Sequence, residues 1–254
     1  MKIGILGGTL NPIHNGHIEI ARAAMGELGL DRVMLLPSGD PPYKRVRTDK
    51  RDRLAMARLA AETYANMFAS DLEVRREGTT YTVDTLSALA VEQPEVEWTY
   101  ILGADALNKL DTWREFPRIA RLCAFAAVSR PGCDEELAKL RATAISTCYH
   151  TRVDLMPVSG PALSSTAVRR RVAEGLSIDD CVPPAALGGD LRHAKPVLLV
   201  GGSGLVGRVP GRHQRHPVQP QLGHRRQRDL DMAVVNGIQR APQDADFHGR
   251  ASKF

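Results

Sequence analysis

Short runs of apolar and β-branched residues alternate with longer amphipathic stretches along residues 1–187, and this alternation constrains the fold more than any other feature. Strands that alternate with helices form crossover units, in which successive strands run parallel. The sequence therefore predicts an α/β fold, a Rossmann-like doubly wound parallel sheet with helices on both faces. The expected strands are 3–6, 32–37, 72–76, 98–102 and 123–129, and the expected helices are 16–29, 51–68, 82–93 and 163–175.

Four loops of unusual composition follow these expected strands. They read GGTLNPIHNGH, SGDPPYK, GAD and SRPG, in chain order. In open α/β sheets, ligands bind beyond the carboxyl ends of the strands. We therefore expect the four loops to lie at one edge of the sheet and to form one binding site.

The bulk composition is that of an ordinary globular protein, with 43% apolar and 25% charged residues in a chain of 254. No apolar run approaches the roughly 20 residues that span a bilayer, so we expect no membrane association. The sequence starts on an expected strand rather than a secretory signal, which favours the cytoplasm. The four cysteines show neither metal-ligand spacing nor a dense disulfide pattern, so we expect reduced thiols.

The net charge of +5 is concentrated late in the chain. Residues 188–254 hold eleven Lys and Arg against five Asp, whereas residues 1–187 hold 23 basic and 24 acidic residues. The later segment also has little apolar periodicity, so it cannot offset the entropy cost of ordering. The sequence thus predicts a domain at 1–187 and an irregular, largely disordered C-terminal extension at 188–254.

The loop after the first expected strand has the composition of an anion site. Gly7 and Gly8 let the backbone approach a bound group without a Cβ in the way. The next helix begins near Gly16, so its N–H groups and dipole face the same place, where His14 and His17 can donate to phosphate oxygens. Two alternatives stay open here: a tight turn with two solvated histidines, or a zinc site without a local third ligand.

The same loop resembles the signature of the nucleotidylyltransferase superfamily, a His-x-Gly-His motif at the first helix, here at 14–17. Four further segments, in matching order, resemble bacterial nicotinate-nucleotide adenylyltransferases over residues 1–184. They are LPSGDPPYK (36–44), REGTTYTVDTL (76–86), ILGADALNKLDTW (101–113) and SSTAVRRR (164–171). The resemblance implies transfer of AMP from ATP to nicotinate mononucleotide in NAD biosynthesis, giving nicotinate adenine dinucleotide and pyrophosphate. It also implies Mg²⁺ held mainly by ATP phosphates, with no protein metal ligand.

By this resemblance, His14, His17, Lys44 and Arg169 would carry the chemistry of AMP transfer. The histidines would hold ATP phosphates, with His17 stabilising charge at the α-phosphoryl group, while Lys44 and Arg169 would supply cations. On its own, Lys44 would be a solvated surface lysine. Further contacts to ATP would come from Gly7, Gly8, Thr9, Gly103, Asp105, Ser164, Ser165 and Thr166.

The resemblance assigns the nicotinate mononucleotide to Lys44, Thr82 and Trp113. Trp113 would stack on the pyridine ring, and Thr82 would hydrogen-bond the carboxylate that distinguishes nicotinate from nicotinamide. The pattern alone is equally compatible with a half-buried core position for Trp113.

Several neighbouring residues are expected to have bland roles. Asp105 is alternatively a helix cap, and the serines at 164–165 are alternatively an ordinary capped helix start. Tyr81 and Asp84 are expected to be structural support. Arg170 and Arg171 are expected to be solvated.

The chain departs from the family pattern in two places. Leu10-Asn11 replaces the usual Phe-Asp of the first loop. The family continues past VPP with a short helix that ends on an aromatic residue, whereas this chain reads AALGGDLRHAKP. We therefore expect that closing helix to be absent.

Three rival functions follow from other features. KPVLLVGGSGLVGR (195–208) has the glycine spacing of a dehydrogenase turn but lacks the helix and the chain length that such a domain needs. The basic extension would bind nucleic acid weakly, and without interleaved aromatic residues we expect no specific recognition. Within the superfamily, nicotinamide mononucleotide or pantetheine phosphate is the alternative acceptor of AMP. A homo-oligomer stays open.

Overall fold

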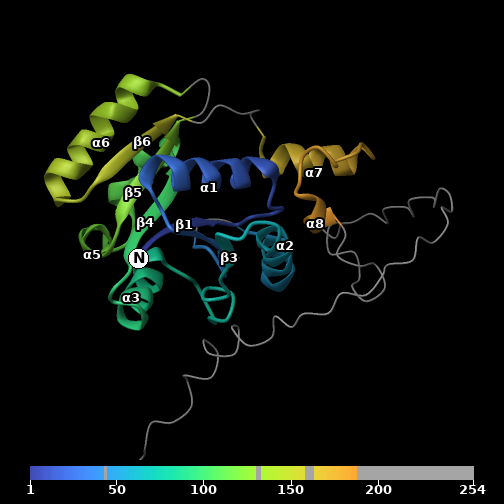
Figure 1. Cartoon of the computed structure of the whole chain (residues 1–254), viewed down its shortest axis with the longest axis horizontal. Helices are drawn as coiled ribbons and strands as arrows, with labels where there is room; N and C mark the ends of the chain where they lie inside the picture. The colour runs from blue at the N-terminus through green and yellow to red at the C-terminus, as the bar shows by residue number, and fades with distance from the viewer. Residues whose placement is uncertain (43–44, 130–132, 158–162, 188–254) are drawn as a thin grey trace, which may run out of the picture. The chain divides into compact units, whose positions relative to one another are not determined.

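The computed structural model describes residues 1–42, 45–129, 133–157 and 163–187. Its frame is a six-stranded parallel sheet in the order β3-β2-β1-β4-β5-β6, which confirms the predicted doubly wound fold (Figure 1). The strand order reverses between β1 and β4, the switch point at which such sheets bind ligands. The strands are β1 (Lys2–Gly8), β2 (Arg32–Pro37), β3 (Met67–Ala69), β4 (Glu97–Gly103), β5 (Ala124–Ser129) and β6 (Val153–Pro157).

Helices cover both faces of the sheet. One face carries α1 (Asn15–Leu28) and α2 (Lys50–Glu62), and the other carries α3 (Thr82–Glu92), α5 (Phe116–Leu122) and α6 (Glu135–Tyr149). The shorter elements are α4 (Ala104–Leu107), the 3-10 helix η1 (Leu110–Thr112) and α8 (Pro184–Leu187). The remaining helix, α7 (Ser165–Ala173), lies beside the N-terminal end of α1 (Figure 1).

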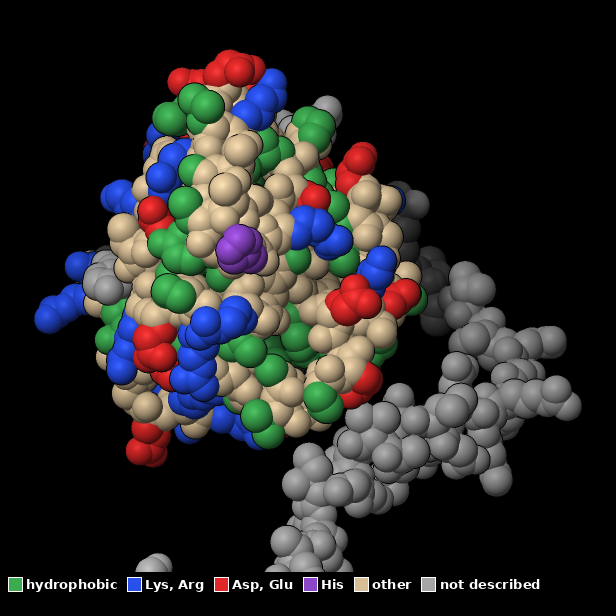
Figure 2. Space-filling view, turned by 90° about the vertical axis from the view of Figure 1, so that its left-hand side faces the viewer, with side chains coloured by type: hydrophobic (Ala, Val, Ile, Leu, Met, Phe, Trp, Pro, Cys, Tyr) green, Lys and Arg blue, Asp and Glu red, His purple; other side chains and the backbone are tan. Residues whose placement is uncertain are grey.

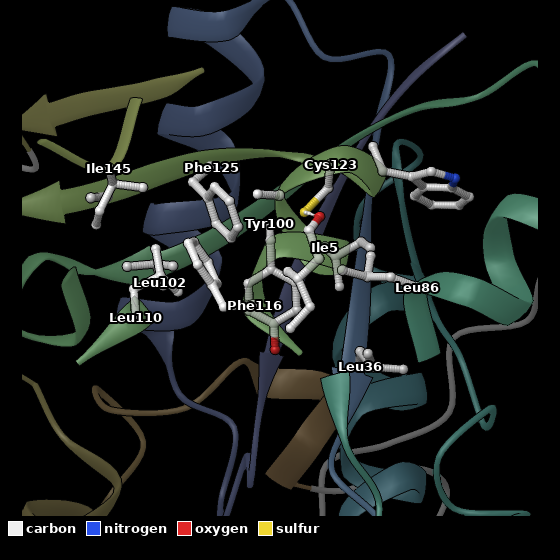
Figure 3. Close-up of a cluster of buried hydrophobic side chains, with 14 of the residues drawn as sticks. Ile5, Leu36, Leu86, Tyr100, Leu102, Leu110, Phe116, Cys123, Phe125 and Ile145 are labelled. Atoms are coloured by element: carbon white, nitrogen blue, oxygen red, sulfur yellow. Dashed lines mark hydrogen bonds between the residues drawn. The ribbon is translucent and has the colours of Figure 1, made fainter. Parts of the chain in front are cut away.

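The core consists of two apolar layers because side chains alternate across the buried strands. Ile5 of β1 and Tyr100 of β4 lie in the layer under α3, α5 and α6, together with Phe125 of β5 (Figure 3). Leu6 and Ile101 lie in the opposite layer, against α1 and α2. Burial of each large apolar side chain contributes about 1.5–3 kcal/mol, so the sheet is a firm base for the loops at its edge.

The prediction is wrong between residues 63 and 76. The helix expected at 51–68 ends at Glu62, and 67–69 forms β3, which pairs with β2. The strand expected at 72–76 is instead a series of turns, in which the Arg75 N–H donates to the Asp71 carbonyl at 2.9 Å. Leu72 and Val74 are buried within these turns. Glu73 between them is buried as well, so the turns bury three consecutive residues rather than the alternate residues of a half-buried strand.

The structure also bears on the expected absence of a closing helix after VPP. The helix expected to be absent after VPP is partly present, because α8 forms one turn with Ala186 buried against the α1 and α2 layer.

All four cysteines are free thiols, and Cys123 and Cys181 are buried. Burial raises the pKa of Cys123 to about 12, so that thiol is protonated at neutral pH. The extension predicted at 188–254 lies outside the described residues.

The surface of the described domain mixes charges of both signs. Figure 2 shows one face, on which acidic, basic and apolar side chains are interspersed. This agrees with the near balance of 23 basic and 24 acidic residues in 1–187. Among the helices of the described ranges, none combines the length and apolarity needed to cross a bilayer.

We expect Gly39→Ala to lower the free energy of unfolding. A Cβ at Gly39 would lie 2.3 Å from the carbonyl oxygen of Glu73, and a backbone atom cannot move aside cheaply. Overpacking of this kind costs about 1–3 kcal/mol. Gly26→Ala in α1 is the matched control, since a Cβ there meets nothing within 4 Å and should stabilise the helix by about 0.5–1 kcal/mol. Urea unfolding of both variants checks this, and equal effects would contradict it.

Candidate active site

The carboxyl end of β1 depends on glycine. A Cβ at Gly7 would lie 2.2 Å from the phenol oxygen of Tyr100, so a larger residue cannot occupy this position beside that buried ring. Gly7 and Gly8 line a cavity at the carboxyl end of the sheet. The backbone of these two residues is therefore exposed to the cavity, and its contact with a bound group stays a prediction.

The two histidines of the motif form one compact unit at the start of α1. The His14 N–H donates to Nδ1 of His17 at 3.2 Å, and the His17 N–H donates to the His14 carbonyl at 2.8 Å. The imidazole rings lie 3.7 Å apart between centroids, and His14 is buried. Because Nδ1 of His17 accepts a hydrogen bond, the proton of a neutral His17 ring belongs on Nε2, which is then a donor.

Helix α7 carries the second predicted phosphate motif, which is distant in the sequence but contacts the loop before the histidines. The Ser164 hydroxyl caps α7 by accepting the Ala167 N–H at 3.1 Å, and the Ser165 hydroxyl donates to the Pro12 carbonyl at 2.9 Å. Arg169 donates to the Asn11 carbonyl and, at 3.1 Å, to the Thr166 hydroxyl. Residues 164–169 therefore lie directly against the loop that precedes the histidines.

A cavity of about 420 Å³ opens at the switch point between β1 and β4. Two of the residues predicted to bind nicotinate mononucleotide, Thr82 and Trp113, line it together with Gly103. Trp113 is half-buried and makes an edge contact with Tyr100, with ring centroids 5.6 Å apart. Trp113 packs against the core, as its core interpretation expects, and it also lines the cavity, so the stacking assignment stays a prediction. Burial raises the pKa of Tyr100, so the phenol that lines this cavity is neutral at physiological pH.

The other predicted residues are placed less uniformly. Asp105 is exposed in the first turn of α4, where Gly103 rather than Asp105 is the N-cap. Thr9 lies in the loop between β1 and α1, and its carbonyl accepts a hydrogen bond from a buried arginine. Lys44 lies outside the described residues.

That arginine, Arg53 of α2, is a central residue that the sequence reasoning missed. It is 1% exposed, and its guanidinium donates to the Thr9 carbonyl and to the Gly39 carbonyl, each at 2.9 Å. Burial lowers its pKa, while the carboxylates of Asp40, Asp49 and Glu73 act in the opposite direction. The arginine thereby ties the loop after β1 to the loop after β2. A periodic helix pattern gave no signal of this, because arginine at a helix position is usually solvated.

Glu73 extends this network toward the cavity. Its carboxylate accepts the Gly39 N–H at 3.3 Å and the Thr85 hydroxyl at 2.9 Å, and the Thr85 oxygen accepts from Arg76 at 3.0 Å. Glu73 is 7% exposed and lines the cavity. The turns at 72–76 thus hold α3, with Thr82 at its first position, against the loop after β2.

Arg114 supplies positive charge to the cavity wall. It is the cation among the described lining residues, and its guanidinium carbon lies 4.6 Å from the ring centroid of Tyr81. Tyr81, which the sequence assigned to structural support, also lines the cavity and holds this arginine by a cation–π contact.

Within the described ranges, no cluster of three or more His, Cys, Asp or Glu residues could hold a metal ion, so the zinc alternative finds no third ligand there.

We expect Arg53→Met to lower the free energy of unfolding by about 3 kcal/mol, because two carbonyls lose charged donors. Arg51→Met is the matched control, since Arg51 is exposed two residues earlier in α2 and surface changes stay within about 0.5 kcal/mol. Chemical denaturation measures both values. A loss below 1 kcal/mol at position 53 would contradict the structural role of the guanidinium.

Comparisons with known proteins bear on the family and the fold of this chain. A family model described as cytidylyltransferase-like matches residues 5–171. "Probable nicotinate-nucleotide adenylyltransferase" of Synechococcus sp. (strain JA-3-3Ab) is 40% identical over 186 residues, covering 72% of this chain and 89% of the relative. The protein of the same name from Neisseria meningitidis serogroup B is 38% identical over 188 residues, covering 73% and 93%. The solved Plasmodium falciparum nicotinic acid mononucleotide adenylyltransferase complexed with NaAD shares the fold, with a TM-score of 0.59 at 19% identity over 73% of this chain and 92% of that one.

Proposed function

This chain belongs to the cytidylyltransferase-like family and, within it, to the nicotinate-nucleotide adenylyltransferases, and we propose that it transfers AMP from ATP to nicotinate mononucleotide. The products are nicotinate adenine dinucleotide and pyrophosphate, a step of NAD biosynthesis. One observation carries the proposal: the histidine pair and the α7 motif meet at the same loop. The two glycines that precede this loop line the same cavity as Thr82 and Trp113. Since both substrates are metabolites of the cell interior, we propose that the enzyme works in the cytoplasm.

The reaction needs positioning and charge stabilisation rather than a protein nucleophile. The phosphate of the mononucleotide attacks the α-phosphorus of ATP in line, and pyrophosphate leaves. His17 is suited to the reacting end, since its Nδ1 is held by the His14 N–H and its Nε2–H is fixed as the donor. Such a donor stabilises charge that develops on the α-phosphoryl oxygens. His14, buried beneath it, orients the ring.

The α7 motif would hold the remaining phosphates of ATP, with one refinement. The single hydroxyl proton of Ser165 goes to the Pro12 carbonyl, so a phosphate contact at this position falls to its backbone N–H at the start of α7. Ser164 accepts its capping bond and retains its own hydroxyl proton as a donor. Arg169 uses two N–H groups on Asn11 and Thr166, and three of its five donors remain for phosphate oxygens.

The cavity would take the nicotinate mononucleotide. Trp113 offers a ring face to the pyridine, and Thr82 offers a hydroxyl to the carboxylate. Arg114, in the same wall, favours an acid over an amide by its charge. The lysine predicted for the mononucleotide phosphate, Lys44, belongs to this proposal on the resemblance alone.

Divalent cation chemistry belongs to the substrate. The groups gathered at the loop are imidazoles, hydroxyls, N–H groups and a guanidinium, which suit phosphate oxygens rather than a bare metal ion. We propose that Mg²⁺ arrives bound to the ATP phosphates, where it neutralises their charge during transfer. The protein side chains would bind and orient the phosphates.

We expect His17→Ala to lower kcat by about 10²–10³, the loss that follows removal of one donor to a developing oxyanion. His150→Ala is the matched control, because His150 is exposed at the end of α6 and lines a separate pocket with residues at the starts of β1, β4 and β5. Pyrophosphate release from ATP, Mg²⁺ and nicotinate mononucleotide is the measurement. Undiminished release by folded His17→Ala would contradict the assigned role.

We expect Thr82→Val to reduce kcat/KM for nicotinate mononucleotide about tenfold or more, because a hydrogen bond to a charged group is lost. The KM for ATP should change little. Thr147→Val, on the exposed side of α6, controls for the substitution itself. Steady-state kinetics with each substrate varied separates the two sites, and equal losses for both substrates would show that Thr82 does not read the carboxylate.

A further inference from the structure

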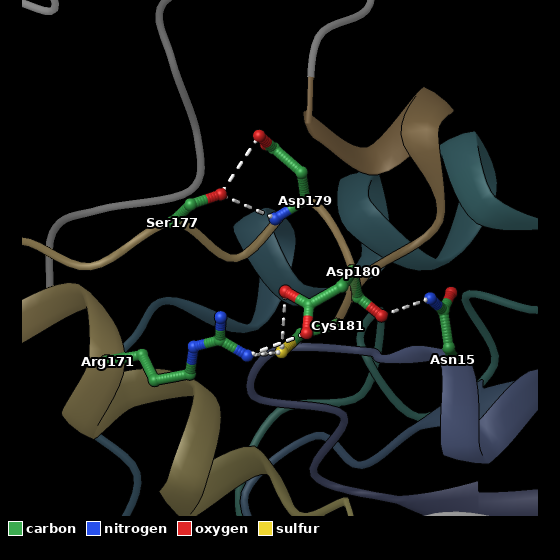
Figure 4. Close-up of polar contacts among 6 residues, drawn as sticks. All are labelled: Asn15, Arg171, Ser177, Asp179, Asp180 and Cys181. Atoms are coloured by element: carbon green, nitrogen blue, oxygen red, sulfur yellow. Dashed lines mark hydrogen bonds and ion pairs between the residues drawn. The ribbon is translucent and has the colours of Figure 1, made fainter.

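The segment that follows α7 contacts the histidine motif in a way the function described so far does not use. We call residues 177–182 the strap. The Asn15 N–H, the first of α1, donates to the Cys181 carbonyl at 2.8 Å, and the Asn15 side-chain amide donates to the Asp180 carbonyl at 3.0 Å (Figure 4). Asn15 is the variable residue of the His-x-Gly-His motif. The backbone N–H and the side-chain amide of Asn15 therefore both hold the strap at the start of the helix.

The strap is also bonded to α7, through a residue expected to be solvated. Arg171 donates from Nη1 to the Asp180 carboxylate at 2.9 Å, and the same nitrogen lies 2.8 Å from the Cys181 sulfur. Figure 4 shows the Arg171 guanidinium directed at both side chains. The expectation for Arg171 is thus wrong, while Arg170 is 73% exposed and lies 4.0 Å from Glu174.

Apolar packing gives the strap one position. Ile178, Cys181 and Val182 form a buried cluster with Val168 of α7, and Val172 packs against it. The Ser177 hydroxyl is bonded to Asp179 within the strap. Because Val168 is adjacent to Arg169, this cluster lies under the phosphate-binding turn of α7. A shift of the strap would therefore displace both α7 and the start of α1.

We propose that Arg171 and Asp180 are positioning residues for AMP transfer, which set the separation of the histidine motif from the α7 motif through the strap and Asn15. This inference rests on the proposed function. The two motifs are far apart in the sequence, and both must bind the triphosphate of the same ATP molecule. An error of about 1 Å in such a constellation can cost roughly 10² in rate. An exposed ion pair contributes little to stability, so the pair should matter more for rate than for folding.

The test compares Arg171→Gln and Asp180→Asn with Arg170→Gln in the full-length protein. We expect kcat to fall about tenfold in the first two, with the KM for nicotinate mononucleotide unchanged, because the cavity that binds it is built from other residues. Thermal unfolding midpoints should stay close to that of the unaltered protein. The Arg170→Gln control should keep full activity.

A charge-swapped variant separates positioning from general damage. Arg171→Asp combined with Asp180→Arg should recover most of the lost kcat, because the ion pair is rebuilt in reverse. Normal kcat in both single variants overturns the inference, as does a swapped variant no better than the single variants. If the unaltered protein releases no pyrophosphate from ATP and nicotinate mononucleotide, the proposed function fails first and the inference with it. An active parent with unaffected variants overturns the inference alone.

Discussion

The rest of the site depends on the two hydrogen bonds that the buried guanidinium of Arg53 donates to backbone carbonyls. This guanidinium reaches from α2 to the carbonyls of Thr9 and Gly39, the loops that follow β1 and β2. A charge this deeply buried is costly unless its hydrogen bonds are made, so its two carbonyl partners hold each loop in one place. The first loop leads to the histidines, and the second borders the cavity. The loop that carries the histidine motif and the loop that borders the cavity are thereby held by one side chain.

The remaining parts are fastened to this base by hydrogen bonds from distant segments. Glu73 links Gly39 to Thr85 and so places α3. Helix α7 reaches the first loop through Ser165 and Arg169. A reaction without a covalent intermediate relies on such preorganised donors, because their orientation is set during folding rather than during the chemical step. The polar network is therefore as much a part of the proposed activity as the groups that touch the phosphates.

The sequence predicted the elements that periodicity describes well. Fully buried parallel strands are nearly continuous apolar runs, and residues 32–37 were accordingly assigned with the bounds that β2 has. The same reasoning failed at 72–76, where Leu72 and Val74 are buried by turns. It also missed the three-residue strand β3, which is too short to show alternation. Helix α6 and strand β6 were not predicted; β6 is the strand at one edge of the sheet, and α6 packs on the same face as α3 and α5.

By itself, the sequence determined the fold class and the family, because apolar periodicity and short motifs can be recognised locally along the chain. Only the tertiary structure decided how those motifs are held. Arg169 meets Asn11 across 158 positions, and Asn15 meets Asp180 across 165. The burial of Arg53 and the pairing of Arg171 with the strap likewise depend on which helices and loops pack together. A local pattern records the kind of side chain at a position, whereas its partner is chosen by the packing of the whole sheet.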